Sequence, residues 1–407
     1  MSFRISLSGM NAATADLNVT SNNIANANTT GFKQGRAEFG DVFAASSSGL
    51  SRNTIGAGVK LAAIAQQFGQ GNIDFTGRNL DLAISGQGFF TLSDGGTTVY
   101  SRAGNFGADA DGFVVNPAGQ RLQVYQPNSS GTGFDTGRLG DLQLTTGDSA
   151  PRASGTVTVQ SNLPANATAP TITPFDPTDP NTYNRTTSLT VYDSLGAAHA
   201  QSLYFVKTAI PNKWELYTTI DGAAVGGMQT LTYSGSGVLT SPSPGTIPLL
   251  PAYDPGNGAN PMALTLDLGA STQFGDSFSL AALTQDGYTT GRLTGIEVTP
   301  DGVVNARYTN GVSTPLGQVA MTNFANPQGL QSLGDNAWAE TSESGQPRRG
   351  QAGTGEFGAV QGGGLEASNV DLTEQLVNMI TAQRTFQANA QMIQTQDQIT
   401  QTVINIR

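Results

Sequence analysis

The most regular stretch of the chain is its last, residues 371–407, DLTEQLVNMITAQRTFQANAQMIQTQDQITQTVINIR. Apolar side chains recur along it in alternating steps of four and three residues, which is typical of a helix that packs lengthwise against another helix. Asp371 and Glu374 form an acidic capping box at its start, and neither glycine nor proline follows. We therefore predict one long helix that runs to Arg407. Its seam consists of Leu372, Leu376, Met379, Gln383, Phe386, Ala390, Ile393, Asp397, Thr400 and Ile404.

The N-terminal segment has the same spacing over residues 3–24. Polar residues interrupt both seams, and the outer face of the C-terminal segment is rich in glutamine, so one pair of these helices is weakly stable by itself. Two arrangements remain open: the helices pair within one monomer, or they pack against further copies of the chain. We expect the ends to be disordered in a free monomer and to become ordered on self-assembly. The N-terminal seam consists of Phe3, Leu7, Met10, Thr14, Leu17, Ser21 and Ile24.

The sequence between the two ends is typical of turn-rich β structure, with 51 glycines, 19 prolines and only 12% charged residues. Short alternating strands predict an antiparallel domain that is interrupted by a second, proline-rich one. The predicted fold is mainly β with terminal α-helices: two nested antiparallel β domains, sandwich-like or barrel-like, are carried on a coiled-coil helix pair by extended stems. The predicted boundaries are 1–30 and 368–407 for the helices, 31–70 and 350–367 for flexible linkers or stems, 71–146 and 285–349 for the inner β domain, and 147–284 for the inserted outer domain.

Composition excludes several classes of function. A net charge of −11 with few charges leaves no basic surface for nucleic acid. The absence of cysteine excludes thiol chemistry and cysteine-ligated metals, and the single histidine, His199, is more typical of a structural residue than of a catalytic one. The sequence contains no apolar run long enough to span a membrane, and no secretory signal peptide opens it. We predict no enzyme activity, no cofactor and no metal site.

One alternative function, of a different class, depends on the carboxylates of the inserted domain. Paired acids hydrolyse glycosides, so a secreted carbohydrate-binding or hydrolytic protein stays open, with exposed Trp214 or Tyr217 beside the acids. Asp109 and Asp111 begin like a calcium loop, but the later ligands are missing, which favours a β-turn. The candidate acids are Asp176, Asp179, Asp193, Glu215 and Asp221.

Motifs at the two ends and in the inner β domain resemble those of the bacterial flagellar rod and hook axial protein family. The match comprises residues 7–12 and 21–33 near the start, 76–90 and 100–106 in the β domain, 365–371 before the last helix, and 379–384 and 387–390 within it. The inserted domain shows no motif of this kind. The signature at the N-terminus consists of Asn22, Asn23, Ile24, Ala25, Asn26, Asn28, Thr29, Gly31, Phe32 and Lys33.

The resemblance implies a structural subunit rather than an enzyme. One inserted β domain in a chain of 407 residues fits the hook, with the distal rod of the basal body as the alternative. It implies a curved, flexible tubular homopolymer outside the cell, which transmits torque from rod to filament for motility. Type III export without a cleaved signal is also implied, as are contacts with the distal rod, the hook–filament junction proteins and, during assembly, the hook cap and export apparatus. The seam residues expected to make the contacts between copies are Leu7, Met10, Leu17, Ile24, Leu372, Leu376, Met379, Phe386, Ile393 and Ile404.

Overall fold

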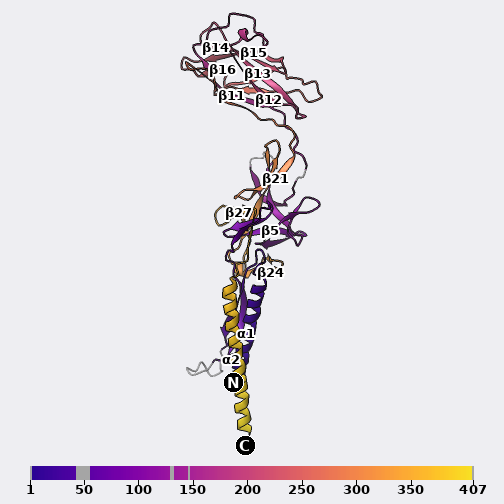
Figure 1. Ribbon diagram of the computed structural model, residues 1–407, viewed down its shortest axis with the longest axis vertical. Coiled ribbons are helices and arrows are strands. Elements are labelled where there is room, and N and C mark those ends of the chain that lie inside the picture. Colours follow the sequence, from indigo (N-terminus) through magenta and orange to yellow (C-terminus); the bar gives the residue numbers. More distant parts are fainter. Residues whose placement is uncertain (1, 43–55, 129–132, 145–146, 406–407) are drawn as a thin grey trace. The chain divides into compact units, whose positions relative to one another are not determined.

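The computed structural model describes residues 2–42, 56–128, 133–144 and 147–405, which form two compact units. Unit 1 contains Met1–Thr146, Gly295–Arg307 and Ser313–Arg407, and unit 2 contains Gly147–Thr294 and Tyr308–Val312. The predicted fold class is confirmed, because the chain is mainly β with a helix at each end (Figure 1), and most of the sequence of unit 2 is an insertion within that of unit 1.

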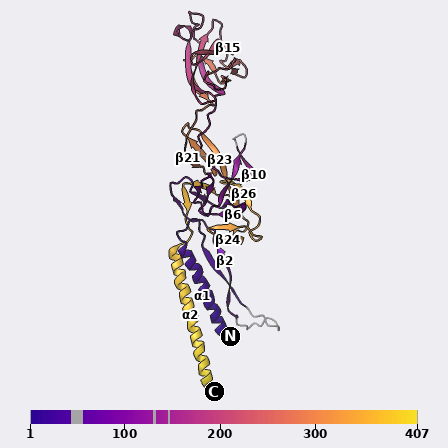
Figure 2. The same cartoon turned by 90° about the vertical axis from the view of Figure 1, so that its right-hand side faces the viewer.

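Two helices begin and end the chain, α1 (Ser2–Ala25) and α2 (Leu372–Asn405). They lie side by side in both views (Figures 1 and 2). The Asp371 half of the predicted capping box is present at the start of α2, since Asp371 Oδ1 accepts hydrogen bonds from the backbone N–H of Thr373 at 2.8 Å and of Glu374 at 3.2 Å. Over the described ranges, neither helix has the length and apolar content needed to cross a membrane.

The N-terminal stem is a paired ribbon where the sequence predicted a flexible linker. Strands β1 (Gly35–Asp41) and β2 (Val59–Gln66) are antiparallel, and the ribbon lies beside α1, whose Ser8 Oγ accepts from the backbone N–H of Val59 at 3.2 Å. The predicted linker run at residues 44–49 lies outside the described residues. The prediction is wrong for the described part because ladder hydrogen bonds and packing on a helix fix a segment of weak intrinsic preference.

The C-terminal stem is also paired. Strand β27 (Ala359–Gly362) is antiparallel to β4 (Leu82–Ser85), and β28 (Gly364–Glu366) is antiparallel to β3 (Ile73–Phe75). Residues that precede the last helix are therefore held against residues that follow the first ribbon.

The inner β structure of unit 1 is one large sheet. Its main path is β21-β22-β23-β9-β5-β6-β25-β24, with β10, β26, β7 and β8 attached at its sides. The core includes Phe90, Leu92, Leu122, Val124 and Met321, all fully buried. The strands are β5 (Phe89–Asp94), β6 (Thr97–Ser101), β7 (Gly107–Ala108), β8 (Val114–Val115), β9 (Arg121–Pro127), β10 (Phe134–Asp141), β21 (Leu293–Val298), β22 (Val303–Tyr308), β23 (Ser313–Asn323), β24 (Gln331–Gly334), β25 (Ala337–Ala339) and β26 (Arg348–Gln351), with the 3-10 turn η2 (Pro327–Gly329).

Unit 2 packs two five-stranded sheets around one apolar core, centred on Trp214, Phe205 and Leu216. One sheet has the order β12-β13-β14-β15-β16 and is antiparallel throughout, but in the other β11 pairs in parallel with β18 and β19, so the prediction of purely antiparallel pairing is wrong there. The strands are β11 (Thr156–Pro164), β12 (Arg185–Tyr192), β13 (Ala198–Lys207), β14 (Lys213–Ile220), β15 (Ala223–Tyr233), β16 (Leu239–Ser241), β17 (Thr246–Pro248), β18 (Thr265–Asp267), β19 (Thr272–Phe274) and β20 (Ser279–Gln285), with the 3-10 turn η1 (Pro180–Thr182).

The insert extends further along the chain than predicted. Backbone bridges join Ser149 to Gly291 and Arg152 to Tyr288, so residues 285–294 close onto the start of the insert. The sequence assigned them to the inner domain because residues 291–298 carry the pattern of a single continuous strand.

Candidate self-assembly surface of the terminal helices

The two terminal helices contact each other through small and polar side chains. On α1, Ser6, Ala13, Thr20 and Asn23 are buried, in steps of seven, seven and three residues, and Gly9 lies between the first two. A Cβ at Gly9 would lie 2.7 Å from Asn389 Oδ1 of α2. Such side chains allow two helix backbones to approach closely, but they bury little apolar surface.

The facing positions on α2 are also occupied by small or polar residues. Gln375 and Ala382 are buried, one heptad apart, and Asn389 follows at the next heptad. Asn23 Nδ2 donates to Gln375 Oε1 at 3.0 Å, so a hydrogen bond between two side-chain amides lies at one end of the contact. The helices thus pair within one monomer in this structure. The residues that make the contact are mostly small or polar, so the spacing of large apolar residues in the sequence does not indicate them.

The predicted apolar seam of α1 lies one residue further along than this contact. Positions 7, 10, 14, 21 and 24 each follow a position of this stripe, and position 17 follows Asp16, which is half-buried; one residue rotates them by about 100° around the helix axis. Phe3 and Leu7 are exposed at 51% and 37%, while Met10, Leu17 and Ile24 are half-buried. The apolar stripe of α1 is therefore less buried than the small and polar stripe beside it, and its Phe3 and Leu7 are exposed.

The predicted seam of α2 borders the helix contact and continues onto the exposed surface. Met379 and Ile393 are half-buried and Phe386 is 36% exposed. Leu372 and Leu376, at 45% and 51%, are exposed. Further apolar side chains of this helix are exposed around it: Val377, Ile380, Met392, Ile399 and Ile404.

The last part of α2 extends past the start of α1. Asn23 opposes Gln375 and Gly9 opposes Asn389, so the N-terminal end of α1 lies near position 396 of the antiparallel partner. Figures 1 and 2 show α2 continuing beyond this point. Ile399 and Ile404 in this overhang are 52% and 67% exposed.

The N-terminal signature forms the end of α1 and the turn that follows it. Asn26 Nδ2 donates to the Asn22 carbonyl at 3.0 Å, and Thr29 Oγ1 donates to Asn26 Oδ1 at 3.2 Å. Gly31 has a φ of +69°, and a Cβ there would meet the backbone of Ala103 and Arg102. Asn23, Gly31 and Lys33 are buried, Ile24, Asn26, Thr29 and Phe32 are half-buried, and Asn22, Ala25 and Asn28 are exposed.

The signature ends in a buried charged cluster that the sequence did not predict. Lys33 pairs with Glu366 and Glu366 pairs with Arg102, although all three residues were part of the motifs that carry the family resemblance. The signal was therefore in the sequence, but spacing alone cannot place residues 33, 102 and 366 together.

Acidic residues of unit 2 serve structural roles. Asp176 Oδ1 and Asp179 Oδ1 each accept hydrogen bonds from residues two positions later, and Glu215 accepts from Tyr217 at 3.0 Å. The carbohydrate-related alternative requires exposed Trp214 or Tyr217 beside these acids, but Trp214 is fully buried and Tyr217 is half-buried. In the part of the chain that the structure describes, no cluster of three or more acidic or histidine side chains has the geometry to hold a metal ion.

His199 is held between the two remaining candidate acids. Its Nδ1 lies 2.6 Å from Asp221 Oδ2, and its Nε2 lies 3.4 Å from Asp193 Oδ2. Burial alone would lower the pKa of His199, but these two hydrogen bonds and charges raise it above its ordinary value. Burial alone would raise the pKa of Asp193, but hydrogen bonds from Asn257 and others lower it to about 2.

Asp109 forms the predicted turn. Its Oδ1 accepts hydrogen bonds from the backbone N–H of Asp111 at 3.0 Å and of Phe113 at 2.7 Å, an arrangement in which the carboxylate is used by its own loop.

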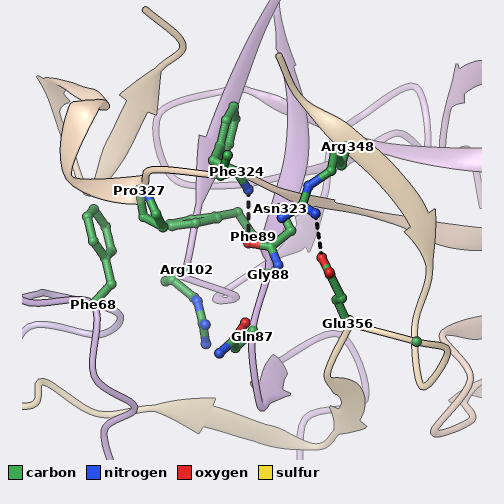
Figure 3. A pocket seen from close by; sticks show the side chains of 12 residues that line it. Phe68, Gln87, Gly88, Phe89, Arg102, Asn323, Phe324, Pro327, Arg348 and Glu356 are labelled. Atoms are coloured by element: carbon green, nitrogen blue, oxygen red, sulfur yellow. Dashed lines mark hydrogen bonds and ion pairs between the residues drawn. The ribbon is translucent and has the colours of Figure 1, made fainter. Parts of the chain in front are cut away.

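A cavity of about 650 Å³ opens in unit 1 between aromatic side chains. Figure 3 shows Phe68, Phe89 and Phe324 around it, together with Arg102 and the Arg348–Glu356 ion pair, whose closest atoms are 2.8 Å apart. No nucleophile with a neighbouring base lies among the residues that line this cavity. Its geometry gives no basis for catalysis.

Comparison with known proteins matches four segments of the chain to family descriptions. Four family descriptions match: "Flagella basal body rod protein" at residues 3–33, "Flagellar hook protein FlgE/F/G D1 domain" at 83–174, "Flagellar basal body protein FlaE D2 domain" at 162–288, and "Flagellar basal body rod FlgEFG protein C-terminal" at 361–406. The inserted domain thus also has a family match.

Similarity extends over whole chains. The flagellar hook protein FlgE of Escherichia coli K12 is 41% identical over 413 residues, which is 100% of both chains. That of Borreliella burgdorferi is 35% identical over 439 residues, with 98% of each chain covered. The crystal structure of the Helicobacter pylori flagellar hook protein FlgE2 matches in fold, with a TM-score of 0.54, 16% identity, and coverage of 72% of this chain and 100% of that one.

Proposed function

We propose that this chain, which belongs to the flagellar hook protein family, is the structural subunit of a flagellar hook. It polymerises into a curved, flexible tube that transmits torque from the rod to the filament and so serves motility. The observation that carries this function is the similarity to hook proteins over the full length of the chain. The same relationship favours the hook over the distal rod, because the relatives that match from end to end are named as hook proteins.

The terminal helices supply the surface for polymerisation in this proposal. Their mutual contact uses small and polar side chains, whereas apolar side chains such as Leu376 and Ile380, each about half exposed, face away from it. Burying a Leu or Phe side chain contributes on the order of 1.5–3 kcal/mol, so a set of these per subunit favours helical stacking of copies. The assignment of Leu7, Met10, Leu17, Ile24 and the α2 seam residues to contacts between copies is part of this proposal.

Other components of the flagellum are the further partners that we propose. The family context supports contacts with the distal rod and the hook–filament junction proteins, and with the hook cap and export apparatus during assembly. We also propose export through the flagellar type III apparatus without cleavage of a signal. The chain has few charges, so few ion pairs hold neighbouring subunits together. This suits sliding of the inserted domains of neighbouring subunits past each other when the hook bends.

The test uses a substitution that leaves the helix contact of the monomer intact. Leu376→Asp places a charge on an exposed apolar position of α2, 51% exposed in the monomer. We expect a soluble monomer with unchanged circular dichroism that forms no tubes under salting-out conditions, because a buried unpaired carboxylate opposes contact between copies. The matched control, Leu376→Met, keeps the apolar volume and should polymerise. Normal tubes from Leu376→Asp would contradict the assignment of this surface.

A further inference from the structure

Three charged side chains meet where the stems of unit 1 join its β sheet. Lys33 Nζ lies 2.6 Å from Glu366 Oε1, and Arg102 donates through a terminal guanidinium nitrogen to Glu366 Oε2 at 3.2 Å. The side chains of Lys33 and Glu366 are 0% exposed and that of Arg102 is 4% exposed. The three belong to segments far apart in the sequence: the turn after α1, the loop after β6, and β28 before α2.

Each of these side chains also bonds to a backbone group of a further segment. Lys33 Nζ donates to the Gly69 carbonyl at 2.7 Å, and Glu366 Oε1 accepts from the Gly71 N–H at 2.9 Å. Arg102 donates to the Gly86 carbonyl at 2.8 Å. The cluster therefore connects both stems with the start of the inner sheet.

A second layer of amide groups continues this connection toward the helices. Asn369 Oδ1 accepts from the Gln34 N–H at 2.9 Å, and Asn369 Nδ2 donates to the Gln67 carbonyl at 2.8 Å. Asn23 of α1 donates both to the Gly35 carbonyl at 2.8 Å and to Gln375 of α2. Both helices are therefore tied to the same set of stem residues by directional bonds.

Stability alone gives no reason for burying these charges. Desolvation of buried ions offsets most of their mutual attraction, and apolar side chains of similar volume often stabilise a fold equally well. What a buried ion cluster adds is a single geometry, because its charged lone pairs and N–H groups are satisfied in few arrangements of partners; here Arg102 Nε alone has no partner, while both terminal nitrogens of its guanidinium donate. A loosely packed apolar joint allows several arrangements of nearly equal energy.

We propose that Lys33, Arg102 and Glu366 are positioning residues that fix the direction of the helix pair relative to the inner β sheet, so that a subunit passes torque between them without bending at its stems. This inference rests on the proposed hook function and adds to it the residues that keep each subunit stiff. The hook then bends through changes in the contacts between subunits, while the stems within each subunit keep their geometry.

The test separates geometry from stability by replacing the whole cluster with apolar side chains. The variant is the triple substitution Lys33→Met, Arg102→Met and Glu366→Leu, expressed as the full chain in a strain that lacks its own hook protein. We expect a melting temperature equal to or above that of the original chain, hooks that still assemble, loss of uniform hook curvature in electron micrographs, and loss of swimming in viscous medium.

The control removes an ion pair of the same unit that joins neighbouring strands and not the stems. Arg121 and Asp141 are 2.9 Å apart and partly exposed, so Arg121→Met with Asp141→Leu should leave curvature and swimming unchanged. If the triple variant builds hooks of normal curvature and stiffness, the positioning role is overturned. If the original chain builds no tube at all, the proposed function fails first and the inference fails with it.

A second variant decides the matter if the triple variant does not fold. Asn369→Ala removes the side-chain bonds of one amide that joins the two stems, at a half-buried position, and leaves those of Asn23 in place. We expect this variant to fold and assemble and to show the same loss of uniform curvature in a weaker form. Hooks indistinguishable from the original in curvature and in viscous swimming would overturn the proposal.

Discussion

At the scale of single residues, His199 of unit 2 gives the clearest dependence on pH. Asp221 and Asp193 bind its two ring nitrogens, and Tyr253 and Asn257 complete the surroundings. The raised pKa of His199 means that its contribution to stability is fully present below its unfolded pKa of about 6.5 and is lost as the pH rises through the folded value. The lowered pKa of Asp193, about 2, means that its contribution is present above about 3.9 and is lost as the pH falls toward 2.

We therefore predict that unit 2 is most resistant to urea between about pH 4 and pH 6.5. The urea midpoint can be followed by the fluorescence of Trp214 in a Trp338→Phe background, because Trp214 is in the core of unit 2 and Trp338 is in unit 1. His199→Gln should lower the midpoint at pH 6 and have a smaller effect at pH 8. An equal loss at both pH values would show that the charge of His199 does not stabilise this unit.

The buried ion cluster shows, also at the residue scale, what sequence reasoning missed. Lys33, Arg102 and Glu366 are ordinary charged residues in their local patterns, and each would be expected on the surface. Only the fold brings them together and excludes water. Asp109, by contrast, was predicted as a turn from its local spacing, and its two hydrogen bonds to its own loop follow from that spacing.

At the scale of elements, the helices were predicted by their period but not by their contacting faces. The alternating spacing and the Asp371 cap indicate α1 and α2, and both are present. The face of α1 in contact with α2 is a stripe of small and polar residues, including Ser6, Gly9 and Ala13, which a search for apolar side chains passes over. The apolar stripe beside it is left for other contacts. Close backbone approach and apolar burial are thus assigned to different faces of the same helix.

Ala13→Leu tests the small-residue contact between the helices. Ala13 is 5% exposed, so a larger side chain must displace α2 or strain its own rotamer, at a cost of about 1–3 kcal/mol. We expect reduced helical signal in the circular dichroism of the monomer and faster proteolysis of both ends. Leu7→Ala, on the exposed stripe of α1, serves as the control and should leave the monomer signal unchanged. A full helical signal from Ala13→Leu would show that Ala13 does not lie in the contact between α1 and α2.

The stems are the elements that the sequence predicted least well. Gly-, Ala- and Thr-rich composition favours a linker, yet β1 and β2 pair over their length and β27 and β28 join the strands of the inner unit. The reason is tertiary: side-chain amides of Asn23 and Asn369 bind backbone groups of the ribbon and fix it beside α1. The Asn369 hydrogen bond joins residues 302 positions apart, which no local pattern contains, and the Asn23 bonds join residues 12 positions apart across the turn that follows α1.

At the scale of the whole molecule, changes in composition and period along the chain predicted the nested order of helix, stem, β domain, inserted β domain, β domain, stem and helix. The end of the insert was placed too early, because strand pattern alone does not show that residues 288 and 291 pair back onto residues 152 and 149. The family of the insert was not predicted at all, since it contains no short motif and its relationship emerges only from comparison over its full length.

The central claim is that the terminal helices build a curved tube from copies of this chain. The most direct measurement is negative-stain electron microscopy of the purified chain under salting-out conditions, beside a variant that lacks residues 1–30 and 370–407. The account predicts curved tubes from the full chain and none from the truncated one. Straight tubes would indicate a rod subunit, and tubes of normal curvature from the truncated variant would contradict the role of the helices.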